Sequence, residues 1–259
     1  MLKIDKLKDI LEDFAPLSLS MKMIENGDYD NSGIIVKSSE NVDGVLFCLD
    51  LTEKAVGLAK AKGINTIVTH HPAIYTPIKT LSYCDDTAAL LCAIKEGFNV
   101  LSMHLNLDVA DNGIDQSLAE ALGAKSTRII SLIDQTHGYG REFEFEGEIT
   151  DMVARIKSTL STDKIIVYGE GNVGVVGSFC GGGASSAQAS VLSGETKADT
   201  IVTSDMPHHI VKALVEKGKN IILIPHYVAE EYGFKKFFLH ATERLSGEQT
   251  EYFEDKRFR

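Results

Sequence analysis

Three short motifs in the sequence combine histidines with carboxylates. They are His70-His71, His104 with Asp108, and His226 with Glu230. Imidazole nitrogens mixed with carboxylate oxygens suit borderline divalent ions such as Zn, Mn, Fe, Co or Ni, whereas a calcium site would use oxygen ligands alone. A single His-x3-Asp segment is common by chance, but the recurrence of all three motifs predicts a metal site.

The motifs follow a segment that the chain contains twice. Asn65-Thr-Ile-Val-Thr69 reappears as Asp199-Thr-Ile-Val-Thr203. After each copy come a helix-like stretch, a short apolar strand and then one of the two segments in which a carboxylate follows a histidine by four residues. A duplicated α/β unit with ligand-type residues at the same strand ends predicts a metal site shared between the two halves.

The adjacent histidines predict more than one ion. On an extended backbone, the side chains of His70 and His71 would point to opposite sides. Two ions would then take one imidazole each, with a bridging carboxylate, as in two-metal hydrolases whose ions lie about 3.5–4 Å apart. The chain contains no GxSxG nucleophile elbow, so water activated by the metal is the expected nucleophile.

Two loops near the second copy also carry polar groups. Asp205, His208 and His209 could be ligands, could orient ligands or could contact a substrate, and we favour the last two roles. Cys180-Gly-Gly-Gly-Ala-Ser-Ser186 precedes an expected helix. This loop could cradle an anion on free backbone N–H groups, or it could be a tight turn that lets two backbones approach.

Composition narrows the class of protein. The 259 residues carry a formal net charge of −11, which argues against nucleic-acid partners because such binding needs clustered Lys and Arg. No run of 18 apolar residues is present, so no membrane partner is expected, and the first residues do not resemble a signal peptide. The four cysteines form no CxxC pair. We therefore expect a cytoplasmic protein.

Strand and helix patterns alternate along the chain. Strands are expected at 33–36, 45–49, 66–69, 100–103 and 174–179, and helices at 4–14, 52–63, from 85 or 86 to 97, 113–123, 150–160 and 231–245. The expected helix caps are Thr52, Asp85 or Asp86, and Thr150. This order indicates an α/β protein with a largely parallel sheet, in which sites gather beyond the carboxyl ends of the strands. The expected divisions are a first repeat at 1–124, a connector at 125–170, and a second repeat with a C-terminal helix at 171–259.

At these residues the chain resembles the NGG-interacting-factor-three-like family, whose members are often named GTP cyclohydrolase type 2 homologues or dinuclear metal-centre hexameric proteins. The resemblance extends over roughly residues 14 to 240. The segments that carry it are Asp30-Asn-Ser-Gly33, Leu49-Asp-Leu-Thr52, Ile67-Val-Thr-His-His-Pro72, His104-Leu-Asn-Leu-Asp108 with Asn112-Gly113, Thr203-Ser-Asp205 with His209, and His226-Tyr-Val-Ala-Glu230.

The resemblance implies two intertwined α/β repeats with mixed, mostly parallel sheets, a homohexameric ring, and two divalent metal ions per subunit. The implied metal ligands are His70, His71, Asp108, His226 and Glu230. Glu230 is the implied bridge, and His104 becomes a residue that orients a ligand or faces the substrate. The family usually has a small residue and a glycine before the last histidine, where this chain has Ile224-Pro225, and glycine where this chain has Ser204. Neither departure removes an implied ligand.

The leading hypothesis is a metal-dependent hydrolase of a nucleotide or another phosphorylated small molecule, similar to the GTP cyclohydrolase type 2 homologues. Under this hypothesis, His104 or His209 would transfer protons near neutral pH. The alternative is a non-catalytic metal-binding scaffold or regulatory protein that assembles as a ring. An open coordination position would favour the enzyme, because structural metal sites are closed and catalytic ones are not.

Overall fold

A computed structural model describes all 259 residues. The chain forms two compact units that are both discontinuous in sequence. Unit 1 comprises residues 1–110 and 234–255, and unit 2 comprises residues 111–233 and 256–259. The range 125–170, expected to be a connector, lies within unit 2, and most of the last 26 residues belong to unit 1. The division differs from the expected one because the end of the chain adds a strand to the N-terminal sheet, pairing Thr250 with Val45.

The sheet of unit 1 has five strands. Their order is β13 (Thr250–Tyr252), β4 (Val45–Cys48), β5 (Thr66–Thr69), β6 (Asn99–Ser102) and β2 (Gly33–Val36). All neighbours are parallel except β2, which is antiparallel to β6. Every residue of β4, β5 and β6 is buried, which is typical of parallel strands covered on both faces.

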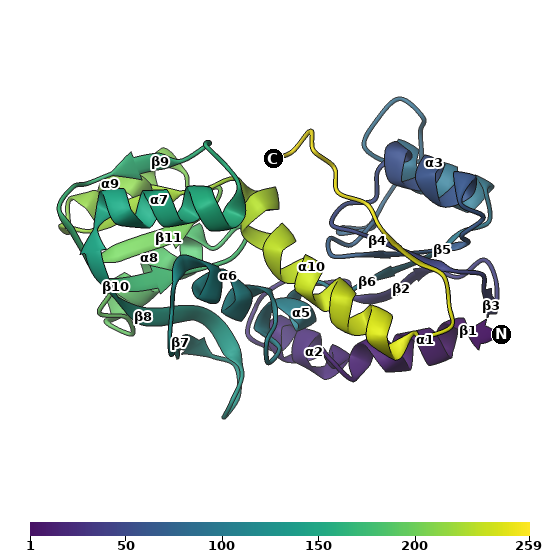
Figure 1. Ribbon diagram of the computed structural model, residues 1–259, viewed down its shortest axis with the longest axis horizontal. Helices are drawn as coiled ribbons and strands as arrows, with labels where there is room; N and C mark the ends of the chain where they lie inside the picture. The colour runs from purple at the N-terminus through teal and green to yellow at the C-terminus, as the bar shows by residue number, and fades with distance from the viewer. The chain divides into compact units, whose positions relative to one another are not determined.

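Helices cover both faces of this sheet (Figure 1). On one face, α3 (Glu53–Ala61) and α4 (Ala88–Lys95) share an apolar cluster with the strands. On the other lie α1 (Ile4–Glu12), α2 (Leu17–Glu25), α5 (Leu105–Val109) and the later turns of α10 (His226–Arg244), where Phe47 stacks edge-on with Phe237 and Phe238. The short strands β1 (Leu2–Lys3) and β3 (Asn41–Val42) form a separate antiparallel pair.

The sheet of unit 2 is mixed. Its order is β7 (Arg128–Leu132), β8 (Gly138–Glu148), β10 (Asn172–Ser178), β11 (Thr200–Thr203), β12 (Asn220–Leu223) and β9 (Ile166–Tyr168). The three central strands β10, β11 and β12 are parallel, and the outer pairings are antiparallel. Strand β8, which falls in the range expected to be a connector, pairs with β10 as an integral part of this sheet.

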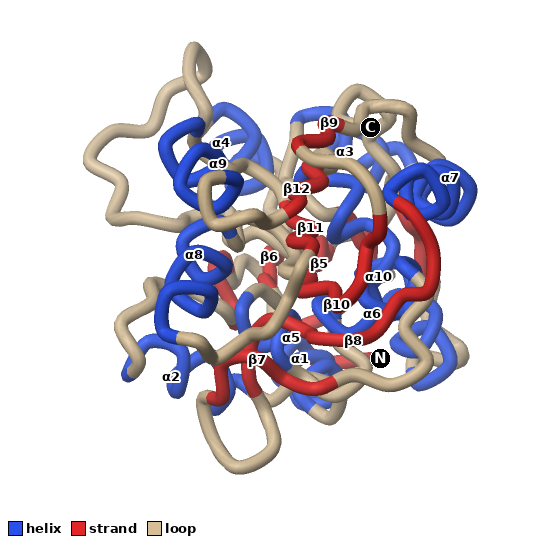
Figure 2. The backbone as a smooth tube through the Cα atoms, turned by 90° about the vertical axis from the view of Figure 1, so that its left-hand side faces the viewer, coloured by secondary structure: helices blue, strands red, loops and turns tan.

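Two layers of helices enclose the central strands of unit 2. Figure 2 shows α8 (Ala184–Ser193) and α9 (His208–Val215) on one side of these strands and α7 (Ile149–Leu160) on the other. Helix α6 (Ile114–Leu122) packs with α7. None of the helices in the structure combines the length and apolar character needed to span a membrane.

Helix boundaries confirm some expected caps and correct others. The Thr52 side chain accepts a hydrogen bond from the Ala55 N–H and caps α3, as expected. Helix α7 instead begins after Glu148, which forms a capping box with Asp151, so Thr150 is not its cap. Thr87, rather than Asp85 or Asp86, occupies the N-cap position of α4.

Helix α10 begins at His226, five residues before the expected start. His226 and Glu230 therefore lie one turn apart on the same face of one helix.

Candidate metal centre

In unit 1, the carboxyl ends of β5 and β6 carry the candidate ligands. His70 and His71 directly follow β5, while His104 follows β6 and precedes α5, which carries Asp108. Because β5 and β6 are parallel neighbours, both of these ends lie at the same edge of the sheet.

His70 is completely buried, and its ring is oriented by the backbone. Its Nδ1 lies 2.8 Å from the carbonyl oxygen of Met103. A carbonyl can only accept, so Nδ1 carries the proton and Nε2 presents a lone pair. That Nε2 lies 3.5 Å from Oδ1 of Asp108. The candidate metal-binding nitrogen, Nε2 of His70, therefore faces the Asp108 carboxylate.

His71 and His104 are oriented in the same way by carboxylates. Nδ1 of His71 lies 2.7 Å from Oδ1 of Asp50, and Nδ1 of His104 lies 2.7 Å from Oδ1 of Asp30. Histidine ligands commonly donate their second ring N–H to a carboxylate or carbonyl, which sets the tautomer and raises the basicity of the ligating nitrogen. His70, His71 and His104 therefore each have the hydrogen-bonded support that is common for metal ligands.

The three imidazoles of unit 1 form one donor group. His70, His71 and His104 each offer a ring nitrogen, and these atoms lie within 4.8 Å of one another. The expectation that His70 and His71 would point to opposite sides is wrong, because the chain bends at both residues instead of continuing as a strand. Their ring centroids are 4.9 Å apart. Adjacent histidines can therefore serve one cavity here.

Asp30, to which the sequence assigned no role, lies 2.7 Å from Nδ1 of His104. Burial raises the pKa of its carboxyl, but hydrogen bonds from His104, Ser20 and Ser32 outweigh burial and hold the pKa below its usual range. An ionised Asp30 would stabilise a positive charge on His104. No local pattern could reveal this pair, since 74 residues separate its members.

In unit 2, the candidate ligands lie on the first turns of α10. Nδ1 of His226 lies 2.5 Å from Oδ2 of Asp205, and Nε2 lies 3.0 Å from Oε1 of Glu230. Asp205 therefore orients His226, which is one of the two roles favoured for it. The Glu230 side chain is only 3% exposed. The His226 imidazole and the Glu230 carboxylate are thus separated by a distance typical of two ligands of one metal ion.

The glycine loop packs directly against this pair. A Cβ atom on Gly181 would overlap the Glu230 carboxylate and lie 3.3 Å from Nε2 of His226. Only glycine permits this approach, and its φ of +56° also favours glycine. At Gly181 the loop backbone therefore approaches two side chains, and the expected approach of two backbones stays a prediction.

A buried ion pair holds the start of the loop. The Cys180 N–H donates to Oδ1 of Asp115 at 3.2 Å, and Arg141 pairs with Oδ2 of the same carboxylate at 2.9 Å. Burial raises the pKa of Asp115 to about 6 although the Arg141 charge lowers it. The Tyr139 hydroxyl donates to the Cys180 carbonyl. Both backbone polar groups of Cys180 are thus bound by the scaffold of unit 2.

His208 and His209 open helix α9 and are exposed. The groups of possible metal donors include neither residue. The role of His209 in proton transfer remains a prediction.

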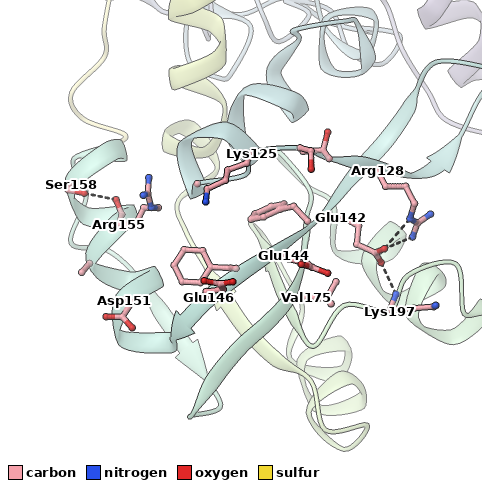
Figure 3. Close-up of a pocket in the computed structure, with 16 residues that line it drawn as sticks. Lys125, Arg128, Glu142, Glu144, Glu146, Asp151, Arg155, Ser158, Val175 and Lys197 are labelled. Atoms are coloured by element: carbon pink, nitrogen blue, oxygen red, sulfur yellow. Dashed lines mark hydrogen bonds and ion pairs between the residues drawn. The ribbon is translucent and has the colours of Figure 1, made fainter.

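A separate groove of about 1350 Å³ lies in unit 2 beside β8 and α7 (Figure 3). Its charged lining residues have both signs, and Glu142 accepts hydrogen bonds from Arg128 and from the Lys197 backbone N–H. No candidate metal ligand lines this groove. The candidate metal ligands therefore lie at the strand ends and do not line this groove.

The donor chemistry at those ends fits divalent metals. Three supported imidazoles with a carboxylate in unit 1, and an imidazole with a carboxylate in unit 2, suit borderline ions. The fold and these groups define a class of α/β proteins whose strand ends could hold divalent metal ions. Within that class, residues 2–255 match the model of the Duf34/NIF3 (NGG1p interacting factor 3) family, and the chain belongs to this family.

Named relatives and solved structures agree with this assignment. The chain is 31% identical over 242 residues to a protein of Clostridium perfringens named GTP cyclohydrolase 1 type 2 homolog, covering 88% of this chain and 87% of the relative. It is 28% identical over 240 residues to the protein NIF3 homolog of Schizosaccharomyces pombe, covering 85% and 82%. The crystal structure of the Staphylococcus aureus hypothetical protein SA1388 superposes with a TM-score of 0.82 at 26% identity, covering 98% and 96%.

Proposed function

We propose that this protein is a metal-dependent hydrolase of a nucleotide or related phosphorylated small molecule. Two divalent ions per subunit would be held by His70, His71, Asp108, His226 and Glu230. The observation that carries the proposal is the common orientation of the three imidazoles in unit 1. Each imidazole is hydrogen-bonded to an acceptor through Nδ1, and the candidate ligand nitrogens lie within 4.8 Å of one another.

When bound, such ions polarise phosphoryl or carbonyl oxygens and lower the pKa of water to about 7. The chain supplies the proton transfer. His104 can accept a proton on Nε2, because its Nδ1–H is bound to Asp30 and the ionised carboxylate stabilises the resulting imidazolium. Glu230, nearly buried beside His226, would act as the bridging carboxylate.

The names of relatives suggest the reaction class. A relative named GTP cyclohydrolase 1 type 2 homolog points to hydrolytic ring opening of GTP, and phosphoester hydrolysis is a second reaction open to the same donor set. We propose that the subunits form the homohexamer implied by the sequence resemblance, which native mass spectrometry would test directly.

Metal analysis of the purified, reconstituted protein tests the proposal. We expect about two equivalents of divalent metal per chain in the wild type. Asp108→Ala and Glu230→Ala should lose metal and turnover of a nucleotide and phosphoester panel together. Asp86→Ala, which removes an exposed carboxylate, is the matched control and should retain both.

A wild-type protein without stoichiometric metal would sink the proposal. Full metal loading without turnover of any member of the panel would favour the non-catalytic scaffold instead.

A further inference from the structure

The two copies of the Thr-Ile-Val-Thr strand end in threonines with different environments. The Thr69 hydroxyl donates to the carbonyl of His71 at 2.7 Å and lies 2.8 Å from the hydroxyl of Ser102. The Thr203 hydroxyl is completely buried and has no hydrogen-bond partner in the protein. Thr69 faces Ser102 across its sheet, whereas Thr203 faces Leu223, whose side chain cannot hydrogen-bond.

The next residue has the same property. Ser204 is completely buried, and its hydroxyl also has no partner in the protein. A buried hydroxyl left unsatisfied costs about 1–3 kcal/mol, and such groups are rare in native proteins. Two of them in sequence at a strand end require an explanation, and a polar ligand supplies one.

Thr203 borders the start of helix α8. A Cβ atom on Gly183 would lie 3.0 Å from the Thr203 hydroxyl oxygen. Gly183 is the N-cap residue of this ten-residue helix and provides no side-chain cap. The first N–H groups of a helix have no partner within it, and the helix dipole places partial positive charge there. The free hydroxyl and these donors therefore belong to one small region.

Hydrogen bonds hold the start of the loop 180–185 in place, and part of the loop is exposed to solvent. Asp115, Tyr139 and Arg141 hold Cys180 as described above. Gly182, two residues later, is exposed, and no atom lies within 4 Å of the position that its Cβ would occupy. The loop is therefore open to a ligand at Gly182, whereas its neighbours Gly181, Gly183 and Ala184 are buried.

We infer that the loop 180–185, together with Thr203 and Ser204, binds a phosphate group of the substrate. The inference rests on the proposed function for its assignment of the ligand as a substrate. Backbone N–H groups at a helix start are a common cradle for phosphate, and the neutral hydroxyls add donors. Contact of Gly181 with Glu230 and His226 places this subsite beside the candidate ligands of unit 2. The Glu230 carboxylate repels an anion, so phosphate alone should bind weakly.

Titration of inorganic phosphate into the chelator-treated, full-length protein tests this subsite without metal. Calorimetry or ³¹P NMR would report the affinity. Thr203→Val removes the hydroxyl while keeping the side-chain shape, and Gly182→Asp adds a negative charge in open space. We expect each variant to weaken phosphate binding at least fivefold. Thr80→Val, which removes an exposed hydroxyl outside the loop, is the matched control and should bind as the wild type does.

Thermal unfolding and metal analysis of the same variants separate a folding defect or metal loss from loss of the subsite. Equal phosphate affinity in the wild type, Thr203→Val and Gly182→Asp would overturn the inference. Binding only after metal loading, insensitive to Thr203→Val, would also overturn it and leave the proposed function intact. Sensitive phosphate binding in a protein that takes up no metal would support the subsite and sink the proposed function.

Discussion

The strand ends of unit 1 and unit 2 begin from the same sequence and differ in the groups that follow. After Thr69 come two histidines, and a third imidazole follows the neighbouring strand. After Thr203 come a buried serine and Asp205, which orients His226, the one histidine of unit 2 among the candidate ligands. The strand ends of unit 1 thus present three candidate nitrogen ligands, each hydrogen-bonded through Nδ1, whereas those of unit 2 present His226, a glycine loop and buried hydroxyls without partners.

The difference shows that two copies of one strand can carry different polar groups at their ends. The four residues of each strand are buried in both units, so packing restricts them. The residues just beyond the strand contact the site instead and can change without disturbing the sheet. We propose that unit 1 contributes more metal ligands than unit 2, which adds groups that contact the substrate to its two ligands, His226 and Glu230.

Removing His70 should produce the largest effect. His70→Ala is expected to lower affinity for Zn²⁺ or Mn²⁺ at least 100-fold, about 2.8 kcal/mol, because it deletes a ligand with a supported tautomer. Ser204→Ala, at the equivalent position of unit 2, should change that affinity less than threefold. Competition with a chelating dye measures both, and equal losses would contradict the proposed division.

Removing a carboxylate that orients a ligand should have a smaller effect. Asp50→Asn and Asp205→Asn are each expected to lower metal affinity about 10- to 100-fold, because the amide can no longer accept the Nδ1–H bond as strongly. The same dye competition applies. Unchanged affinity in Asp50→Asn would show that His71 does not depend on this orientation.

The two equivalent threonines should differ in their contribution to stability. Thr69→Val is expected to lower the free energy of unfolding by about 1–3 kcal/mol, because it leaves the Ser102 hydroxyl and the His71 carbonyl short of a partner. Thr203→Val should be neutral or stabilising, because its hydroxyl has no partner in the protein. Urea unfolding of the metal-free proteins compares them, and a similar cost at both sites would argue against an unsatisfied Thr203.

Two buried carboxylates should give opposite pH dependences of stability, the smallest expected effect. The folded-state pKa of Asp30 lies below 3.8, so its contribution is present above that value and is lost as the pH falls through the folded-state pKa. The pKa of Asp115 is raised from 3.8 to about 6, so its contribution is present below 3.8 and is lost as the pH rises to about 6.

Urea unfolding at a series of pH values tests this contrast in metal-free protein. Asp30→Asn should make the loss of stability in acid shallower, and Asp115→Asn should remove a decline between pH 3.8 and about 6. Asp115→Asn also lowers stability above about pH 6, where the ionised Asp115 is the buried counter-charge of Arg141. The slope is therefore the readout, and slopes equal to those of the wild type would contradict the assignment.

Sequence patterns predicted the strand ends well because local signals suffice there. The β-branched sequence Thr-Ile-Val-Thr predicts both β5 and β11, and the histidine that follows β5 marks where that strand ends. The pairing of Asp30 with His104 and of β13 with β4 could not be read in this way, because each joins residues far apart in the chain. The unsatisfied Thr203 depends on the residue across the sheet, Leu223, and thus on register.

Helix α10 carries His226 and Glu230 in its first turns, which belong to unit 2, and continues from Phe234 as part of unit 1. With the transitions at 110–111 and 255–256, the chain passes between the units three times. No single cut can therefore release either unit as an uninterrupted polypeptide. A cut at 110–111 would leave every strand of the unit 2 sheet in one piece but would separate β13 from the sheet of unit 1, so that sheet is complete only when the two pieces are produced together.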